Sequence, residues 1–169
     1  MPGFRPWQLA LVLALVLASG ASMGSDGLRV ENPGEITFAV AAMTPRAKEL
    51  GLTNSGVAAS LKSSLSRAGL AARQSDLDDR GSDVLFIDII VEDETFYASL
   101  GFWRMASYRL PGGKLNSELV TVWQDYSVGA HNDDPATVRA TVNRIVSRFI
   151  SQYRDVNDVG VPLRVASTP

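Results

Sequence analysis

The one histidine of the sequence, His131, is the residue with the widest choice of chemistry. With the carboxylates of Asp133 and Asp134 it has the side-chain types of a metal site, and with a serine it has those of a hydrolytic triad. The sequence lacks the Gly-x-Ser-x-Gly turn that presents such a serine, however. Pro135 directly follows the two acids, which is typical of the first turn of a helix. We therefore expect a helix cap here, and a hydrolase centred on His131 is the least favoured function.

The other acidic and glycine-rich patterns also indicate structure rather than catalysis. The acids of segment 76–83 do not match a calcium loop, because its twelfth position needs a glutamate and Ile87 stands there. Asp88 and Glu92 lie on one side of a strand but about 13 Å apart, further than the paired carboxylates of glycoside hydrolases. Gly112-Gly113-Lys114 lacks the spacing of a phosphate-binding loop and predicts a hairpin turn. We predict no metal, no cofactor and no enzymatic activity.

The composition excludes further classes of protein. The chain has 169 residues, with 16 Lys and Arg against 18 Asp and Glu, a net charge of −2, and no cysteine. This length fits a single domain. Without cysteine there is no disulfide, thiolate zinc site, cysteine nucleophile or lipid-modified N-terminal cysteine. Nucleic-acid-binding proteins normally carry a strong basic excess, so we expect no nucleic-acid partner.

The first 24 residues have the pattern of a secretory signal peptide. Arg5 precedes an unbroken apolar run, Leu9–Ala18, and small residues follow it. A ten-residue helix rises about 15 Å, half of the hydrocarbon core of a bilayer, so a cleaved peptide is favoured over a membrane anchor. Cleavage after Gly20, Ala21 or Gly24 would fit the pattern. We expect a mature protein in the periplasm or secreted from the cell, with no transmembrane span.

The spacing of apolar residues predicts the order strand, helix, strand, strand, strand, helix. The strands are 35–40, 84–92, 95–108 and 117–128, and the helices are 54–68 and the segment from residues 133–134 to 157–160. Each helix has one apolar stripe, so both should cover the same face of the sheet. The predicted fold is an α+β domain over residues 25–160, with a mixed four-stranded sheet, two helices on one face and a loose tail at 161–169.

The register of the predicted sheet is clear at one hairpin and open at the next. Pairing Val91 with Phe96 across the first hairpin places apolar residues opposite each other along both strands. For strand 117–128, a five-residue connection, Pro111–Leu115, places Trp103 opposite Trp123. A four-residue loop turns the whole strand over instead. The sequence allows both.

The face of the sheet opposite the helices is predicted to carry aromatic side chains. Alternation places Tyr97, Trp103 and Met105 there beside Ile90, and Trp123 joins them in the five-residue register. Aromatic residues gathered on an open sheet face are typical of a binding surface. The competing interpretation is a second core beneath the loops, or ordinary strand propensity.

The order of elements over residues 35–157 resembles small exported α/β domains of Gram-negative cell envelopes. These include the lipopolysaccharide-assembly lipoprotein fold, the N-terminal domain of the Tol β-propeller protein and transport-auxiliary lipoproteins. Val122-Trp123-Gln124, Phe149-Ile150, Tyr153 and Asn157 also resemble a stretch of uncharacterised secreted bacterial proteins. The lipoproteins are tethered through a lipidated cysteine, which this chain lacks. The resemblance implies a non-enzymatic role in the envelope.

These observations lead to one expected function and one alternative. The expected function is a soluble, non-catalytic periplasmic domain that contacts another envelope component through its open sheet face or its sheet edge. Pairing of edges would also allow a homo-oligomer. The alternative is a small-ligand protein that holds a lipid or glycan between the sheet and the helices.

Overall fold

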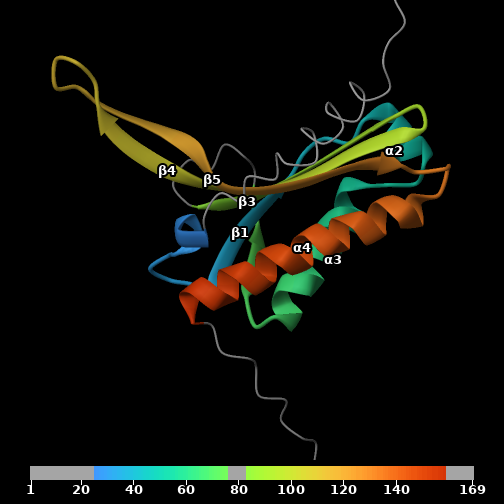
Figure 1. Ribbon diagram of the computed structural model, residues 1–169, viewed down its shortest axis with the longest axis horizontal. Helices are drawn as coiled ribbons and strands as arrows, with labels where there is room; N and C mark the ends of the chain where they lie inside the picture. Colours follow the sequence, from blue (N-terminus) through green and yellow to red (C-terminus); the bar gives the residue numbers. More distant parts are fainter. Residues whose placement is uncertain (1–24, 76–82, 159–169) are drawn as a thin grey trace, which may run out of the picture.

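The computed structural model describes residues 25–75 and 83–158, which form one mixed sheet covered by helices (Figure 1). The predicted leader, most of the acidic loop and the tail lie outside these residues. The elements in chain order are η1 (Ser25–Leu28), β1 (Glu35–Val40), α2 (Pro45–Glu49), α3 (Asn54–Arg67), β2 (Ala71–Gln74), β3 (Val84–Glu92), β4 (Thr95–Arg109), β5 (Leu115–Ala130) and α4 (Pro135–Asn157).

The predicted α+β class with a mixed sheet is confirmed, but the sheet has five strands and not four. Its order is β2-β1-β3-β4-β5, with β1 parallel to β2 and β3 and the remaining pairs antiparallel. The missed strand is β2, the four residues Ala71–Gln74. It lies at the edge and none of its side chains is fully buried. It therefore leaves no hydrophobic alternation for a sequence pattern to detect.

The sequence predicts two helices, but the described residues contain a third α-helix, α2. Only five residues long, it begins after Thr44, whose side chain accepts from the amide of Ala47. The same hydroxyl donates to the carbonyl of Val91 at 3.0 Å and accepts from its amide. Thr44 therefore fixes α2 to β3, and this long-range contact makes so short a helix persist.

The two long helices lie on the same face of the sheet (Figure 1). Thr53 caps α3 and Asp134 caps α4, each through a side-chain oxygen that accepts a first-turn amide. The apolar stripes of both helices pack on the inward side chains of the sheet. The largest fully buried members of this core include Phe38, Leu61, Leu65, Leu85, Ile87, Ile89, Phe149 and Tyr153.

The pairing between β3 and β4 is confirmed, whereas that between β4 and β5 differs from the five-residue prediction. Phe102 lies opposite Trp123, but Trp103 lies opposite Thr121. Val122 is therefore an extra residue, a β-bulge in β5. The connection runs through the five residues 110–114, one position earlier than Pro111–Leu115.

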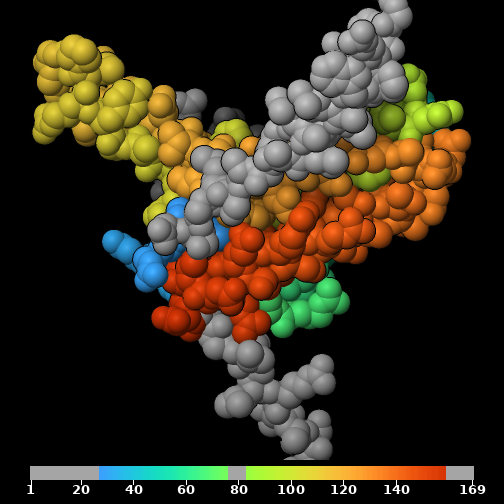
Figure 2. All heavy atoms as spheres, viewed as in Figure 1, coloured from blue at the N-terminus to red at the C-terminus, as the bar shows by residue number. Residues whose placement is uncertain are grey.

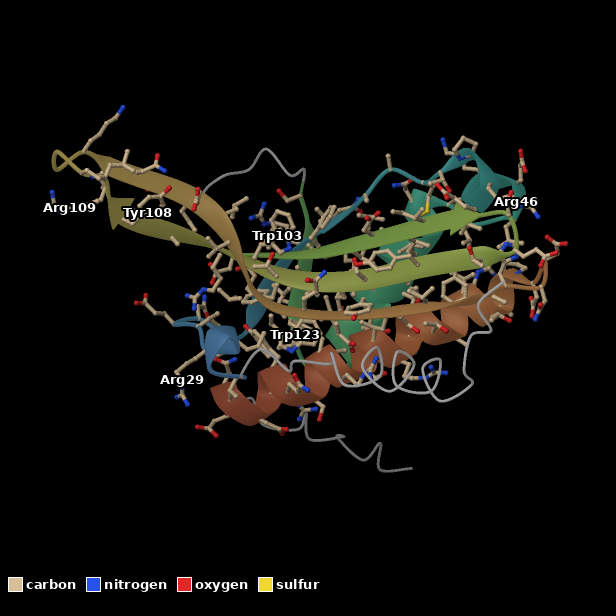
Figure 3. The ribbon with its side chains drawn as sticks, turned by 45° about the horizontal axis from the view of Figure 1, so that its top comes forward. Arg29, Arg46, Trp103, Tyr108, Arg109 and Trp123 are labelled. Carbon is tan, nitrogen blue, oxygen red and sulfur yellow. The ribbon has the colours of Figure 1, made fainter. Side chains whose placement is uncertain are left out.

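The bulge decides the position of Trp123, which lies on the helix-covered side of the sheet. Its indole contacts Phe149 edge-on, with ring centroids 5.2 Å apart, and its Nε1 donates to Gln152 at 2.6 Å. The expectation that Trp123 joins Trp103 on the open face is thus wrong in this register. Figure 3 shows the two indoles on opposite sides of the β4–β5 ribbon.

Beyond Trp103, β4 and β5 separate from the rest of the sheet. Trp103 is the last residue of β4 that pairs with β3, and it lies opposite Val84. Residues 104–109 and 115–120 then pair only with each other. They form a two-stranded projection, here called the arm, which extends well past the helices (Figure 1).

Contacts from the N-terminal segment fix the base of the arm. Asn157 in the last turn of α4 donates to the carbonyl of Leu28 and accepts from the amide of Val30. Arg104 donates to the carbonyl of Arg29 at 2.8 Å. A Cβ on Gly27 would lie 2.6 Å from the carbonyl oxygen of Val122, so only glycine lets the segment pass this close to the bulge.

Replacement of the two sheet tryptophans should have unequal effects on stability. Trp123→Ala removes a buried side chain and should lower the free energy of unfolding by about 3–5 kcal/mol. Trp103→Ala, the matched control on the other face, should cost about 1 kcal/mol because the indole is only partly buried. Urea unfolding followed by far-UV circular dichroism measures both values. Equal losses would contradict the assignment of the two faces.

Candidate functional site

The face of the sheet away from the helices carries a row of exposed apolar side chains across three strands. Ile90 of β3 lies opposite Tyr97 of β4, which lies opposite Val128 of β5. The ring of Tyr126 stacks on that of Tyr97 with centroids 6.1 Å apart. Ile90, Tyr126 and Val128 are 36%, 51% and 67% exposed. We call these four residues the open-face patch.

Strand alternation brings the patch together. Between the bulge and the end of β5, Trp123, Asp125 and Ser127 lie opposite inward-facing residues of β4, so Tyr126 and Val128 face outward. The sequence interpretation missed these two residues. In its five-residue register Trp123 faces outward, so Tyr126, three residues further along the strand, would face the helices. The signal that could have found them is the four-residue alternative, which reproduces the observed pairing over this half of β5.

Only one of the four predicted site residues, Tyr97, belongs to the open-face patch. Trp103 lies six residues further along β4, about 20 Å away, and contacts Phe86 at 5.5 Å between centroids. Its indole lies across Gly101, where an added Cβ would be 2.6 Å from Nε1. Met105 is further out on the arm, and Trp123 is on the opposite face. The predicted aromatic cluster is therefore divided.

A polar strip separates the patch from Trp103. Asp88 lies opposite Ser99, and both face the open side between Ile90 and Phe86. Glu92 lies beyond Ile90 on the same side of β3. Asp88 therefore lies on the face of the sheet away from the helices. The patch is therefore an apolar surface with carboxylates on both sides of Ile90.

His131 is fully buried, and both of its ring nitrogens are engaged. The amide of Asp133 donates to Nδ1 at 3.0 Å, so the proton of the neutral ring is on Nε2. Nε2 then donates to the carbonyl of Asp93 at 2.6 Å. The histidine thus joins the β3–β4 hairpin to the loop before α4. No nitrogen is left to accept a proton from a serine or to bind a metal.

Removal of this imidazole should destabilise the fold. His131→Ala removes a fully buried side chain and takes away the hydrogen-bond partner of the Asp93 carbonyl and the Asp133 amide, so it should lower the free energy of unfolding by about 2–4 kcal/mol. Ser147→Ala, at an exposed position of α4, is the matched control and should stay within about 0.5 kcal/mol of wild type. Thermal and urea unfolding test this. A His131→Ala protein as stable as wild type would contradict the role of His131 in joining the β3–β4 hairpin to the loop before α4.

Among the described residues, two of the cavities lie beside the sheet. The first, about 250 Å³, lies between α3 and α4, with Val57, Ile89 and Val142 among its walls and Arg139 at its rim. The second, about 420 Å³, lies beside the start of β1 and has charged walls. Arg104 and Asp83 form an ion pair of 3.0 Å there. The second reaches the size of ligand pockets, while the first falls short of it.

Tyr153 is the titratable group most affected by burial at the second cavity. Burial raises the pKa of its phenol to about 12, with a further rise from Asp83 and an opposing effect of Arg104. The hydroxyl reaches the carbonyl of Pro33 at 3.4 Å. At neutral pH the group is a neutral phenol that packs against Phe102 and Phe149. It therefore acts as part of the core.

The raised pKa of Tyr153 predicts a loss of stability in alkali. The unfolded chain releases this proton near pH 10, while the folded chain keeps it until about pH 12, so stability falls across that interval. Tyr153→Phe removes this one contribution. The stability difference between wild type and Tyr153→Phe should change by about 2 kcal/mol between these limits, measured by urea unfolding at each pH. If the free energy of unfolding changed with pH equally in the two proteins, the phenol of Tyr153 would not be shielded from water in the folded state.

Further features of the described residues concern metals and membranes. Within 25–75 and 83–158, no three His, Asp or Glu side chains come together as metal ligands. Over those same ranges, no helix has both the length and the apolar character needed to cross a bilayer.

A scan against protein-family models found no match, and a search of curated proteins found no relative. The resemblance to envelope domains therefore remains an expectation.

Proposed function

We propose that this protein is a non-catalytic domain, exported to the bacterial envelope, that binds another envelope protein through the open-face patch. The observation that carries the proposal is the continuity of Ile90, Tyr97, Tyr126 and Val128 across three strands. Exposed apolar side chains are common singly, but a contiguous apolar row that includes two tyrosines is typical of a binding surface. The signal-peptide pattern supports the location.

The chemistry around the patch specifies the kind of partner. Asp88 and Glu92 stand on the two sides of Ile90, so a matching surface has an apolar centre and basic residues at its margin. Tyr97 and Tyr126 offer large, stiff rings with few rotatable bonds, which suits residues at the centre of an interface.

The open face is a better binding surface than the long edge of the sheet. The edge strand β5 carries a bulge at Val122, and the N-terminal segment packs against it through Gly27. An added strand could therefore not pair continuously along β5. This interruption also disfavours a homo-oligomer formed through edge pairing.

Site-specific crosslinking in the native host tests the proposal. The photoreactive residue p-benzoylphenylalanine replaces Tyr126 in one variant and exposed Arg144 of α4 in a matched control. Irradiation should give an adduct of one defined mass from position 126 and none from position 144. No adduct at position 126, the same adduct at both positions, or an adduct with the mass of two copies of this chain would each contradict the proposal.

Substitutions in the open-face patch test how much it contributes to the affinity for the partner. Once the crosslinked partner is purified, Tyr126→Ser with Val128→Ser should weaken its binding by at least about 30-fold, because loss of even one residue at an interface centre costs about 2 kcal/mol. Both side chains are exposed, so the thermal midpoint should hardly change. Isothermal titration calorimetry measures the affinity. Unchanged affinity would place the interface elsewhere.

A further inference from the structure

The tip of the arm exposes apolar side chains that make no contribution to the core. Tyr108, Leu110 and Leu115 are 40%, 38% and 60% exposed. Figure 2 shows the arm standing clear of the body of the molecule, and Figure 3 shows Tyr108 and Arg109 near its end. The fold does not need these side chains, because the buried cluster contains none of them.

These apolar side chains lie on both sides of the ribbon. Tyr108 pairs with Asn116 on one side, and Arg109 pairs with Leu115 on the other, since neighbouring residues of a strand face opposite ways. A flat protein surface would cover one side and leave the other in water. A medium that surrounds the tip covers both, and a lipid bilayer does so.

The charge of the tip is basic. Residues 107–117 contain Arg109 and Lys114 and no acidic residue, although the chain as a whole has a net charge of −2. The acid that follows them, Glu118, accepts a hydrogen bond from the Tyr108 hydroxyl at 3.3 Å, so basic residues outnumber acids at the tip by two to one. Apolar side chains beside basic ones are the composition of segments that lie in the head-group region of an anionic membrane. Tyrosine is enriched at the same depth.

Part of the backbone of the turn at the tip is paired within the turn itself. The amide of Leu110 donates to the carbonyl of Lys114 at 2.8 Å, and that of Gly113 donates to Leu110 at 3.0 Å. Arg109 donates from Nη1 to the carbonyl of Gly113 at 3.2 Å. Backbone groups paired within the turn need no water, which reduces the cost of entering the interface.

We propose that the arm tip inserts into the surface of an anionic lipid bilayer. Tyr108, Leu110 and Leu115 enter the head-group layer, and Arg109 and Lys114 bind lipid phosphates. About 20 Å of strand separates the tip from Trp103, so the tip reaches the lipid while the body remains in water. This surface is separate from the open-face patch and does not depend on it.

Vesicle flotation tests this membrane contact. The chain starting at Ser25 is used, because the apolar run Leu9–Ala18 would itself bind lipid and the buried cluster that the structure describes is made of residues after Ser25. Vesicles contain phosphatidylcholine alone or with about 30% phosphatidylglycerol. Wild type should float with the anionic vesicles at low salt and much less with the neutral ones, and binding should weaken as salt screens the charges.

Two tip variants separate the apolar from the electrostatic contribution to vesicle binding. Leu110→Ser with Leu115→Ser should weaken binding to anionic vesicles by at least about tenfold. Arg109→Gln with Lys114→Gln should weaken it on the order of 25-fold, about fivefold for each charge. Val128→Ser, in the open-face patch, is the matched control and should leave vesicle binding unchanged. Circular dichroism checks that all variants remain folded.

Three outcomes would overturn the inference. They are absence of binding to anionic vesicles, binding that both tip variants retain in full, and a dimer in sedimentation that the tip variants abolish while vesicles stay unbound. The last outcome would assign the tip to a second copy of this chain. None of them bears on the crosslink from position 126, so the membrane contact and the protein partner can fail independently.

Discussion

The bulge at Val122 is the feature on which the two ends of the β4–β5 ribbon depend. One extra residue in β5 reverses the side-chain alternation, so the part near α4 and the part in the arm follow different registers. On the inner side it places Trp123 over Phe149. On the outer side it leaves Trp103 opposite Thr121, at the point where β3 ends its pairing. An unbroken register would place one of these two halves on the wrong face.

The N-terminal segment and α4 hold this point in place. Gly27 lies against Val122, Asn157 binds the backbone of Leu28 and Val30, and Arg104 binds Arg29. At the other end of the sheet, His131 joins the β3–β4 hairpin to the loop before α4. The ribbon is thus fixed at both ends of its packed half, and the arm begins just beyond the point that the N-terminal segment holds. Rigidity at these points lets the exposed side chains keep defined positions.

Two surfaces remain that the fold itself does not use. The open-face patch is an apolar surface of the sheet, with two tyrosines and with carboxylates beside it, whereas the arm tip is narrow, apolar on both sides and basic. Their chemistries differ enough to suit different partners: a protein surface for the patch and an anionic bilayer for the tip. Together they describe a domain that could hold a protein partner close to a membrane, with the sheet as a rigid connection between the two contacts.

Much of this molecule follows from local sequence alone. Val84–Glu92 and Thr95–Phe102 specify their own pairing, because only one register places apolar residues opposite each other, and the two long helices follow from their stripes and caps. The short edge strand β2, the bulge at Val122 and the clamp around His131 do not follow from it, because each depends on residues far away in the chain. The sequence therefore determined which residues are apolar enough to be buried or to bind. Tertiary structure decided the face on which they lie, since a one-residue bulge exchanges the two faces of a strand without any change in the sequence.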